Sequence, residues 1–101
     1  MLGPQPVTIH VTQEDIHLGV CKDAEECAIA LALAHKYKDH VNWVEVENID
    51  SIKMADSLRD KWYRVHICPD DDVKVHDFLR DFDDGQKVEP FSFDINEIEE
   101  E

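Results

Sequence analysis

Residues 69–93 read PDDDVKVHDFLRDFDDGQKVEPFSF and carry the clearest structural signals of the chain. Asp70, Asp71 and Asp72 follow Pro69, and an acidic first turn caps free amides and complements the positive end of a helix dipole. Four apolar residues then fall at i, i+3, i+4 and i+7: Val75, Phe78, Leu79 and Phe82. This spacing predicts an amphipathic helix that begins after Pro69.

Three aspartates recur with the same period on another face of this helix: Asp77, Asp81 and Asp84. Gly85 is expected to end the helix, because glycine readily adopts the left-handed conformation of a C-terminal cap. Residues 88–95 then read as an extended segment. Since Pro90 has no N–H to donate to a neighbouring strand, we expect this segment to lie at the edge of a sheet.

The composition describes one small, strongly acidic domain. The chain has 101 residues, 43% of them hydrophobic, which favours a single folded core over a disordered acidic tail. Its formal net charge is −14. Such an imbalance repels nucleic acid and membrane phosphates and attracts basic surfaces, so we expect no direct nucleic-acid binding and no membrane binding.

No secretory signal and no apolar run long enough to span a bilayer are visible, so a cytoplasmic location, in a host cell, is expected. The three cysteines, Cys21, Cys27 and Cys68, are odd in number and unevenly spaced. Their pattern suits reduced thiols better than a disulfide framework.

The first part of the chain predicts one strand and two helices. Val7, Ile9 and Val11 alternate with polar residues, as in a half-buried strand. Thr12 is the expected N-cap of a short helix that stops at Gly19. Asp23 is the expected cap of a second helix over residues 24–38, whose run of alanines, isoleucine and leucines predicts burial on more than one side.

The middle of the chain predicts a three-stranded meander. Its segments are residues 41–47, 48–54 and 61–68, with a turn over 55–60. Together these elements predict an α+β domain over residues 7–95, with a mostly antiparallel sheet of about four or five strands and about three helices packed on one face. Residues 1–6 are expected to form a flexible lead and residues 96–101 a frayed acidic tail.

Three fragments resemble a group of small uncharacterised acidic proteins encoded by tailed phages and prophages. They are VTIHVTQEDIHLG (7–19), CAIALA (27–32), and FLRDFDDG (78–85) with VEPFSF (88–93). In that group the second helix often has a paired cysteine before it and Cys-Pro after it, whereas here Cys27 precedes Ala28 and Cys21 is too distant for Cys-x-x-Cys. The resemblance implies an origin in phage biology and supplies no catalytic residues and no cofactor.

The candidate partner-binding surface consists of carboxylates. Its residues are Asp70, Asp71, Asp72, Asp77, Asp81, Asp83, Asp84 and Glu97, joined by Asp94 and the last glutamates. Duplex DNA carries one negative charge per about 1.7 Å of axis, and acids one or two helical turns apart lie about 5 to 10 Å from one another. An acidic helix can therefore imitate part of a phosphate row. The alternative is a solvated face that serves only solubility.

A metal site and an enzyme are both less favoured. The zinc candidates considered are Cys21, Cys27, His66 and Cys68, but they lack paired spacing, and Cys27 fits a buried core better. His66 and Cys68 alternate on one strand, which rarely aligns a base with a nucleophile. No phosphate loop or hydrolase motif is present.

The aromatic residues leave two interpretations open. Trp43, Trp62 and Tyr63 either fill the core or anchor an interface. The face of the last meander strand that carries Trp62, Arg64 and His66 is the place to look for a partner or for self-association.

The sequence therefore favours a stoichiometric inhibitor of a host defence complex, similar to an anti-CRISPR protein, which binds a basic host protein surface by imitating nucleic acid. The alternative is a phage accessory or structural protein that forms a homodimer or larger homo-oligomer, with the charge serving solubility.

Overall fold

The computed structural model describes residues 6–56 and 61–100. Its elements follow the order β1 (Val7–Val11), α1 (Gln13–Leu18), α2 (Ala28–Lys36), β2 (Trp43–Asn48), β3 (Ser51–Ala55), β4 (Trp62–Ile67), the 3₁₀ turn η1 (Pro69–Asp71), α3 (Asp72–Asp83) and β5 (Phe91–Glu100). The α+β prediction is confirmed. The predicted turn over residues 55–60 lies largely outside the described residues.

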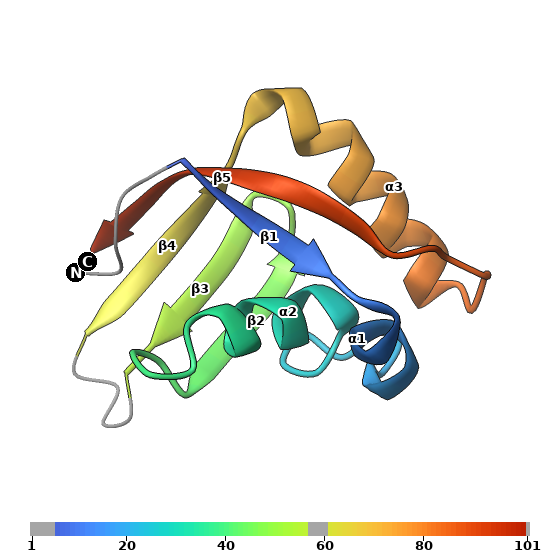
Figure 1. Ribbon diagram of the computed structural model, residues 1–101, viewed down its shortest axis with the longest axis horizontal. Coiled ribbons are helices and arrows are strands. Elements are labelled where there is room, and N and C mark those ends of the chain that lie inside the picture. The colour runs from blue at the N-terminus through green and yellow to red at the C-terminus, as the bar shows by residue number, and fades with distance from the viewer. Residues whose placement is uncertain (1–5, 57–60, 101) are drawn as a thin grey trace.

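The five strands form one antiparallel sheet in the order β1-β5-β4-β3-β2 (Figure 1). The predicted meander is confirmed, since β2, β3 and β4 pair in sequence order. The sheet curls, and α2 packs against both of its edge strands, β1 and β2.

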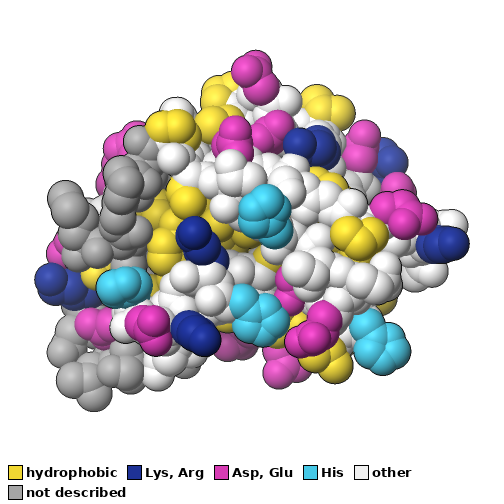
Figure 2. All heavy atoms as spheres, in the orientation of Figure 1, with side chains coloured by type: hydrophobic (Ala, Val, Ile, Leu, Met, Phe, Trp, Pro, Cys, Tyr) yellow, Lys and Arg dark blue, Asp and Glu magenta, His cyan; other side chains and the backbone are white. Residues whose placement is uncertain are grey.

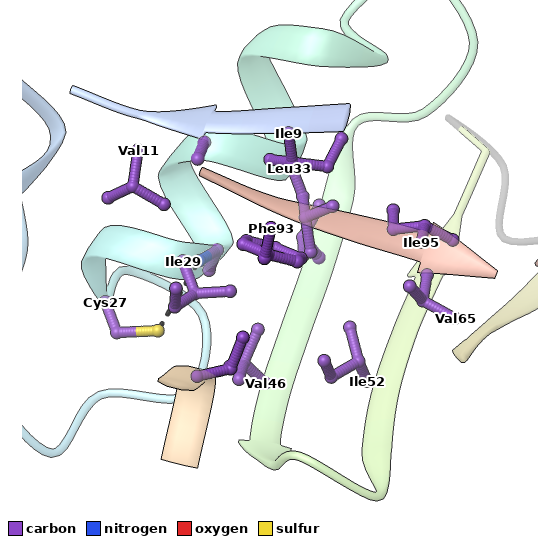
Figure 3. Packing of buried hydrophobic residues seen from close by; sticks show 14 of the residues in the cluster. Ile9, Val11, Cys27, Ile29, Leu33, Val46, Ile52, Val65, Phe93 and Ile95 are labelled. Atoms are coloured by element: carbon purple, nitrogen blue, oxygen red, sulfur yellow. Dashed lines mark hydrogen bonds between the residues drawn. The ribbon is translucent and has the colours of Figure 1, made fainter. Parts of the chain in front are cut away.

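Alternation along the strands directs one set of side chains into a single core. Buried residues of all five strands join those of α2 and α3 in one apolar cluster, with α1 packed against α2. Ile29 and Leu33 of α2 meet Phe93 of β5 in its centre, as Figure 3 shows. The predicted burial of the alanine-rich helix is confirmed. Among the described residues no helix packs on the opposite face of the sheet, here called the open face.

The start of α2 differs from the prediction. The helix begins at Ala28 with Cys27 as its N-cap, and the Cys27 Sγ accepts a hydrogen bond from the Ala30 N–H at 3.5 Å. Asp23 instead accepts bonds from the N–H groups of Glu25 and Glu26, at 2.9 and 3.1 Å. Asp23 therefore closes a turn upstream of the helix, because a carboxylate competes locally for backbone donors.

Helix α1 follows its prediction closely. Thr12 is the N-cap, and its side chain accepts from the Asp15 N–H while the Asp15 carboxylate accepts from the Thr12 N–H at 3.0 Å. Gly19 ends the helix at a close approach, because a Cβ there would lie 2.8 Å from the Phe82 ring and 2.9 Å from the Ala28 nitrogen. Glycine is required at this position because a Cβ atom would clash with these neighbours, whereas the backbone angles are accessible to any residue.

Two predictions about the C-terminal strand are wrong. The segment expected at an edge is β5, which lies between β1 and β4. Pro90 precedes the first residue of β5 and so removes no ladder hydrogen bond. Residues 96–100 are not a frayed tail, because they continue β5 and pair with β4, with Glu100 opposite Tyr63.

Candidate functional site

The predicted acidic surface is built on α3, which the core holds firmly. Val75, Phe78 and Phe82 are buried, and the Phe78 ring packs on Phe91 of β5 with centroids 4.6 Å apart. The apolar stripe is thereby confirmed, with Leu79 partly buried. Gly85 has φ +77 and follows the cap residue Asp84, as predicted for the helix stop.

Three aspartates form a partly exposed row along this helix and its C-cap, here called the acidic stripe (Asp77, Asp81 and Asp84). The side chains of Asp77 and Asp81 are 49% and 41% exposed. At 1.5 Å rise per residue, Asp81 and Asp84 lie about 6 and about 10 Å along the axis from Asp77. Arg80 partly offsets this charge, with contacts of 3.4 Å to Asp77 and 3.2 Å to Asp81.

The acids at the start of the helix do not cap it as predicted. Asp71 is the N-cap but makes no side-chain capping bond. Its Oδ2 accepts the Asp94 N–H of β5 at 2.7 Å, and its Oδ1 lies 3.4 Å from Lys74 Nζ. Asp70 is exposed on η1 and Asp72 is the first residue of α3. Asp71 therefore joins the helix to the sheet and is only 18% exposed.

Two more predicted residues lie apart from the stripe. Asp83 accepts the Lys22 N–H at 2.8 Å and is half-buried. Glu97 lies on β5, opposite His66 of β4, and not on α3. Figure 2 shows acidic side chains along the α3 edge of this view and also over its lower edge, so acidity is not confined to α3.

The open face of the sheet carries the aromatic residues that the sequence left undecided. Trp43 and Trp62 flank Ala55 across β2, β3 and β4, with ring centroids 5.0 Å apart. The Trp43 Nε1 donates to Glu25 Oε1 at 2.6 Å. Ala55 is fully buried although it lies outside the core cluster, while Tyr63 belongs to the core. The two tryptophans thus cover one corner of the outer face.

The next row of the open face places two neighbouring cations between two acids across the strands: Glu45, Lys53, Arg64 and Glu99. Desolvation raises the pKa of Glu45, and the nearby Glu47 raises it further. This face is mixed in charge, whereas among the described residues the acidic stripe is contacted by Arg80 and by the His76 ring, whose Nδ1 lies 3.6 Å from Asp77 Oδ1.

The cysteines and histidines do not form a site. Among residues 6–56 and 61–100, no group of three or more His, Cys, Asp or Glu side chains is placed to hold a metal ion. Cys21 is exposed and donates to the Phe82 carbonyl at 2.9 Å, Cys27 is buried, and all three cysteines are free thiols. Burial raises the pKa of the Cys27 thiol, which keeps it protonated and unreactive.

Sequence reasoning missed a pocket of about 300 Å³ beside α3. It is formed where the loop before α2, the β2–β3 turn and α3 meet. One signal was available in the sequence: Ile49 occupies a turn where polar residues or glycine are usual.

Comparison of the chain with family models, curated proteins and solved structures returned no match. None of the described helices has the length and apolar character needed to cross a membrane.

Proposed function

We propose that this protein acts by stoichiometric binding, in which the acidic stripe docks on a basic surface of another protein that otherwise holds nucleic-acid phosphates. The observation that carries the proposal is the row of partly exposed carboxylates at Asp77, Asp81 and Asp84 along a helix whose opposite side is anchored in the core. A rigid scaffold keeps the charges in place, so little ordering entropy is lost on binding.

The partner class follows from charge and from the resemblance to phage proteins. A net charge of −14 speeds association with basic surfaces and disfavours nucleic acid itself. We infer a host nucleic-acid-handling protein, such as a CRISPR effector, with the protein serving as its inhibitor. Acids elsewhere on the surface add to the long-range field and to solubility.

The test combines capture of partners from host lysate with a variant of the stripe, Asp77→Asn/Asp81→Asn/Asp84→Asn. Three partly exposed charge contacts of about 0.5 kcal/mol each predict an affinity loss of about tenfold and a weaker dependence on salt. The matched control, Glu14→Gln/Glu26→Gln/Asp39→Asn, removes the same charge from exposed positions outside α3. We expect a much smaller loss from it, and equal losses would contradict the proposal.

Arg80→Gln supplies a test in the opposite direction. Arg80 contacts two acids of the stripe, so its removal leaves the stripe more negative and is expected to strengthen binding to a basic partner. Weaker binding by this variant would show that the row of carboxylates is not the contact surface.

A second candidate function is homo-oligomerisation through the open sheet face, favoured by the Trp43–Trp62 pair on its surface. Light scattering discriminates between the two. A tight oligomer that Trp62→Ser disrupts, together with no affinity for basic proteins, would favour this candidate.

A further inference from the structure

The pocket beside α3 has a defined apolar floor. Its apolar lining comes from three segments that are far apart in the sequence: Ala24, Cys27, Val46, Ile49 and Leu79. Ile49 and Leu79 pack against the core and remain partly exposed. A hollow of this size is at the lower end of the range that takes small ligands, and it suits one apolar side chain.

Backbone contacts fix the walls of the pocket. The Val46 N–H donates to the Ala24 carbonyl at 2.7 Å, which ties the loop before α2 to the edge of β2. Lys22 has φ +61, and its N–H donates to Asp83 of α3 at 2.8 Å. A left-handed non-glycine residue costs free energy, and such residues concentrate at ligand sites. These contacts hold the pocket open in advance of binding.

The charged side chains around the pocket determine which charge should accompany an apolar group that binds there. Its rim has three acids, Asp23, Glu47 and Asp83, against the cations Lys22 and Arg80 and the titratable His76. Arg80 already contacts Asp77 and Asp81 of the stripe. With three acids against two cations the rim has a formal charge of −3 plus 2, or −1, and the negative field of the whole molecule adds to it, so together they favour an apolar group that is accompanied by positive charge.

Arg80 also makes the pocket continuous with the acidic stripe, because it lines the first and contacts the second. We propose that the pocket receives an apolar side chain that lies next to a basic residue on the partner protein. This inference rests on the proposed function and adds the specificity determinant to it. The stripe supplies long-range attraction, while the pocket selects the partner by an apolar anchor, as at binding hot spots.

The test uses three capped tripeptides as probes, Arg-Leu-Arg, Arg-Gly-Arg and Glu-Leu-Glu, titrated into isotopically labelled protein and followed by amide NMR shifts. Arg-Leu-Arg is expected to shift the amides of Lys22, Val46, Ile49 and Leu79. It should bind about tenfold more tightly than Arg-Gly-Arg, the lower end of the effect of small apolar differences in a hydrophobic pocket. Equal binding of the two, no binding, or shifts confined to other residues would overturn the proposal.

Two variants keep the test specific. Ala24→Leu fills the pocket and Ile49→Ser makes one wall polar at an exposed turn, and each should abolish the preference for Arg-Leu-Arg over Arg-Gly-Arg. Val73→Ala is the control, because Val73 is 71% exposed on α3 and does not line the pocket. Dispersed NMR spectra confirm folding of each variant. Retention of the preference by both folded pocket variants would contradict the proposal.

The two proposals fail in different experiments. If the native protein binds Arg-Leu-Arg no more tightly than Arg-Gly-Arg, the pocket proposal is contradicted and the proposal for the acidic stripe is unaffected. If the stripe variant binds the captured partner as well as the native protein does, the proposed function fails whatever the peptides show.

Discussion

Asp15 is the one charged residue that is almost completely buried in the described part of the chain, at 1% exposure. One carboxylate oxygen accepts bonds from the N–H and hydroxyl of Thr12, both at 3.0 Å. The other lies 2.9 Å from His35 Nδ1 of α2 but makes no hydrogen bond among the described residues. Asp15 therefore both caps α1 and links it to α2.

Replacement of Asp15 by Asn should lower the free energy of unfolding by about 1–3 kcal/mol, because a buried group loses its partners. Thr12→Ala removes only the cap and should cost about 1 kcal/mol. Urea denaturation followed by circular dichroism measures both. An Asp15→Asn variant as stable as the native protein would show that the His35 contact and the charged cap contribute nothing.

Cys27 predicts how stability changes at alkaline pH. Burial raises the pKa of its thiol, so the folded state keeps a proton that the unfolded state releases. The free energy of unfolding is unaffected by this thiol below the ordinary thiol pKa and falls as pH rises toward the raised pKa. Cys27→Ala should show a smaller fall above about pH 8.5, the ordinary thiol pKa. Cys21→Ala, which removes a thiol at an exposed position, is the matched control.

Residue patterns predicted most of the elements because their causes are local. The Thr12 cap, the Gly85 stop and the α3 apolar stripe follow from hydrogen bonds and periodicity within a few residues, whereas the need for glycine at position 19 comes from the packing of Phe82. Cys27 is different. Its role as the N-cap of α2 depends on where the preceding loop pairs with β2, through Ala24 and Val46, and no local pattern specifies that contact.

Strand β5 shows where local reasoning fails. A proline indicates an edge strand only if it lies within the strand, and Pro90 precedes β5. The acidic C-terminal end of β5 resembles a solvated tail in the sequence, because the sequence does not show that β4 pairs with it. Local sequence patterns also predicted only part of the candidate site. The spacing of Asp77, Asp81 and Asp84 was readable, but the diversion of Asp71 and Asp83 into structural bonds and the existence of the pocket depend on long-range packing.

Deletion of residues 97–101 tests the role assigned to β5. The deletion removes the last four of the ten residues of β5, including Ile98, which packs against the core opposite Val65. We expect the melting temperature to fall by more than about 10 °C, since 1 kcal/mol corresponds to about 4–8 °C in a domain of this size. Glu97→Gln/Glu99→Gln/Glu100→Gln removes charge but keeps the strand and should melt near the native temperature. A small effect of the deletion would restore the tail interpretation.

The whole molecule concentrates a formal charge of −14 within a radius of gyration of 12.5 Å. This dimension is shorter than the Debye length of about 30 Å at 0.01 M salt and similar to the value of about 10 Å at 0.1 M. Repulsion among the acids therefore opposes the folded state at low salt and is screened as salt is added.

Sodium chloride should accordingly raise the melting temperature between 0.01 and 0.3 M at neutral pH, measured by calorimetry. The stripe variant lacks three carboxylates, so its formal charge is −14 plus 3, or −11, and its gain should be smaller. A melting temperature that does not depend on salt would mean that the acids are far enough apart to be independent of one another.

The placement of β5 between the first strand and the meander also affects the order in which the fold can assemble. The meander closes through short turns, but Thr8 meets Asp94 across 86 residues of chain. Strands that are so far apart in the sequence must lose loop entropy before their contacts can form, and such pairings slow folding. The docking of β5 is therefore the natural rate-limiting event, and until it occurs one side of β4 and the whole of β1 are unpaired and open to intermolecular association.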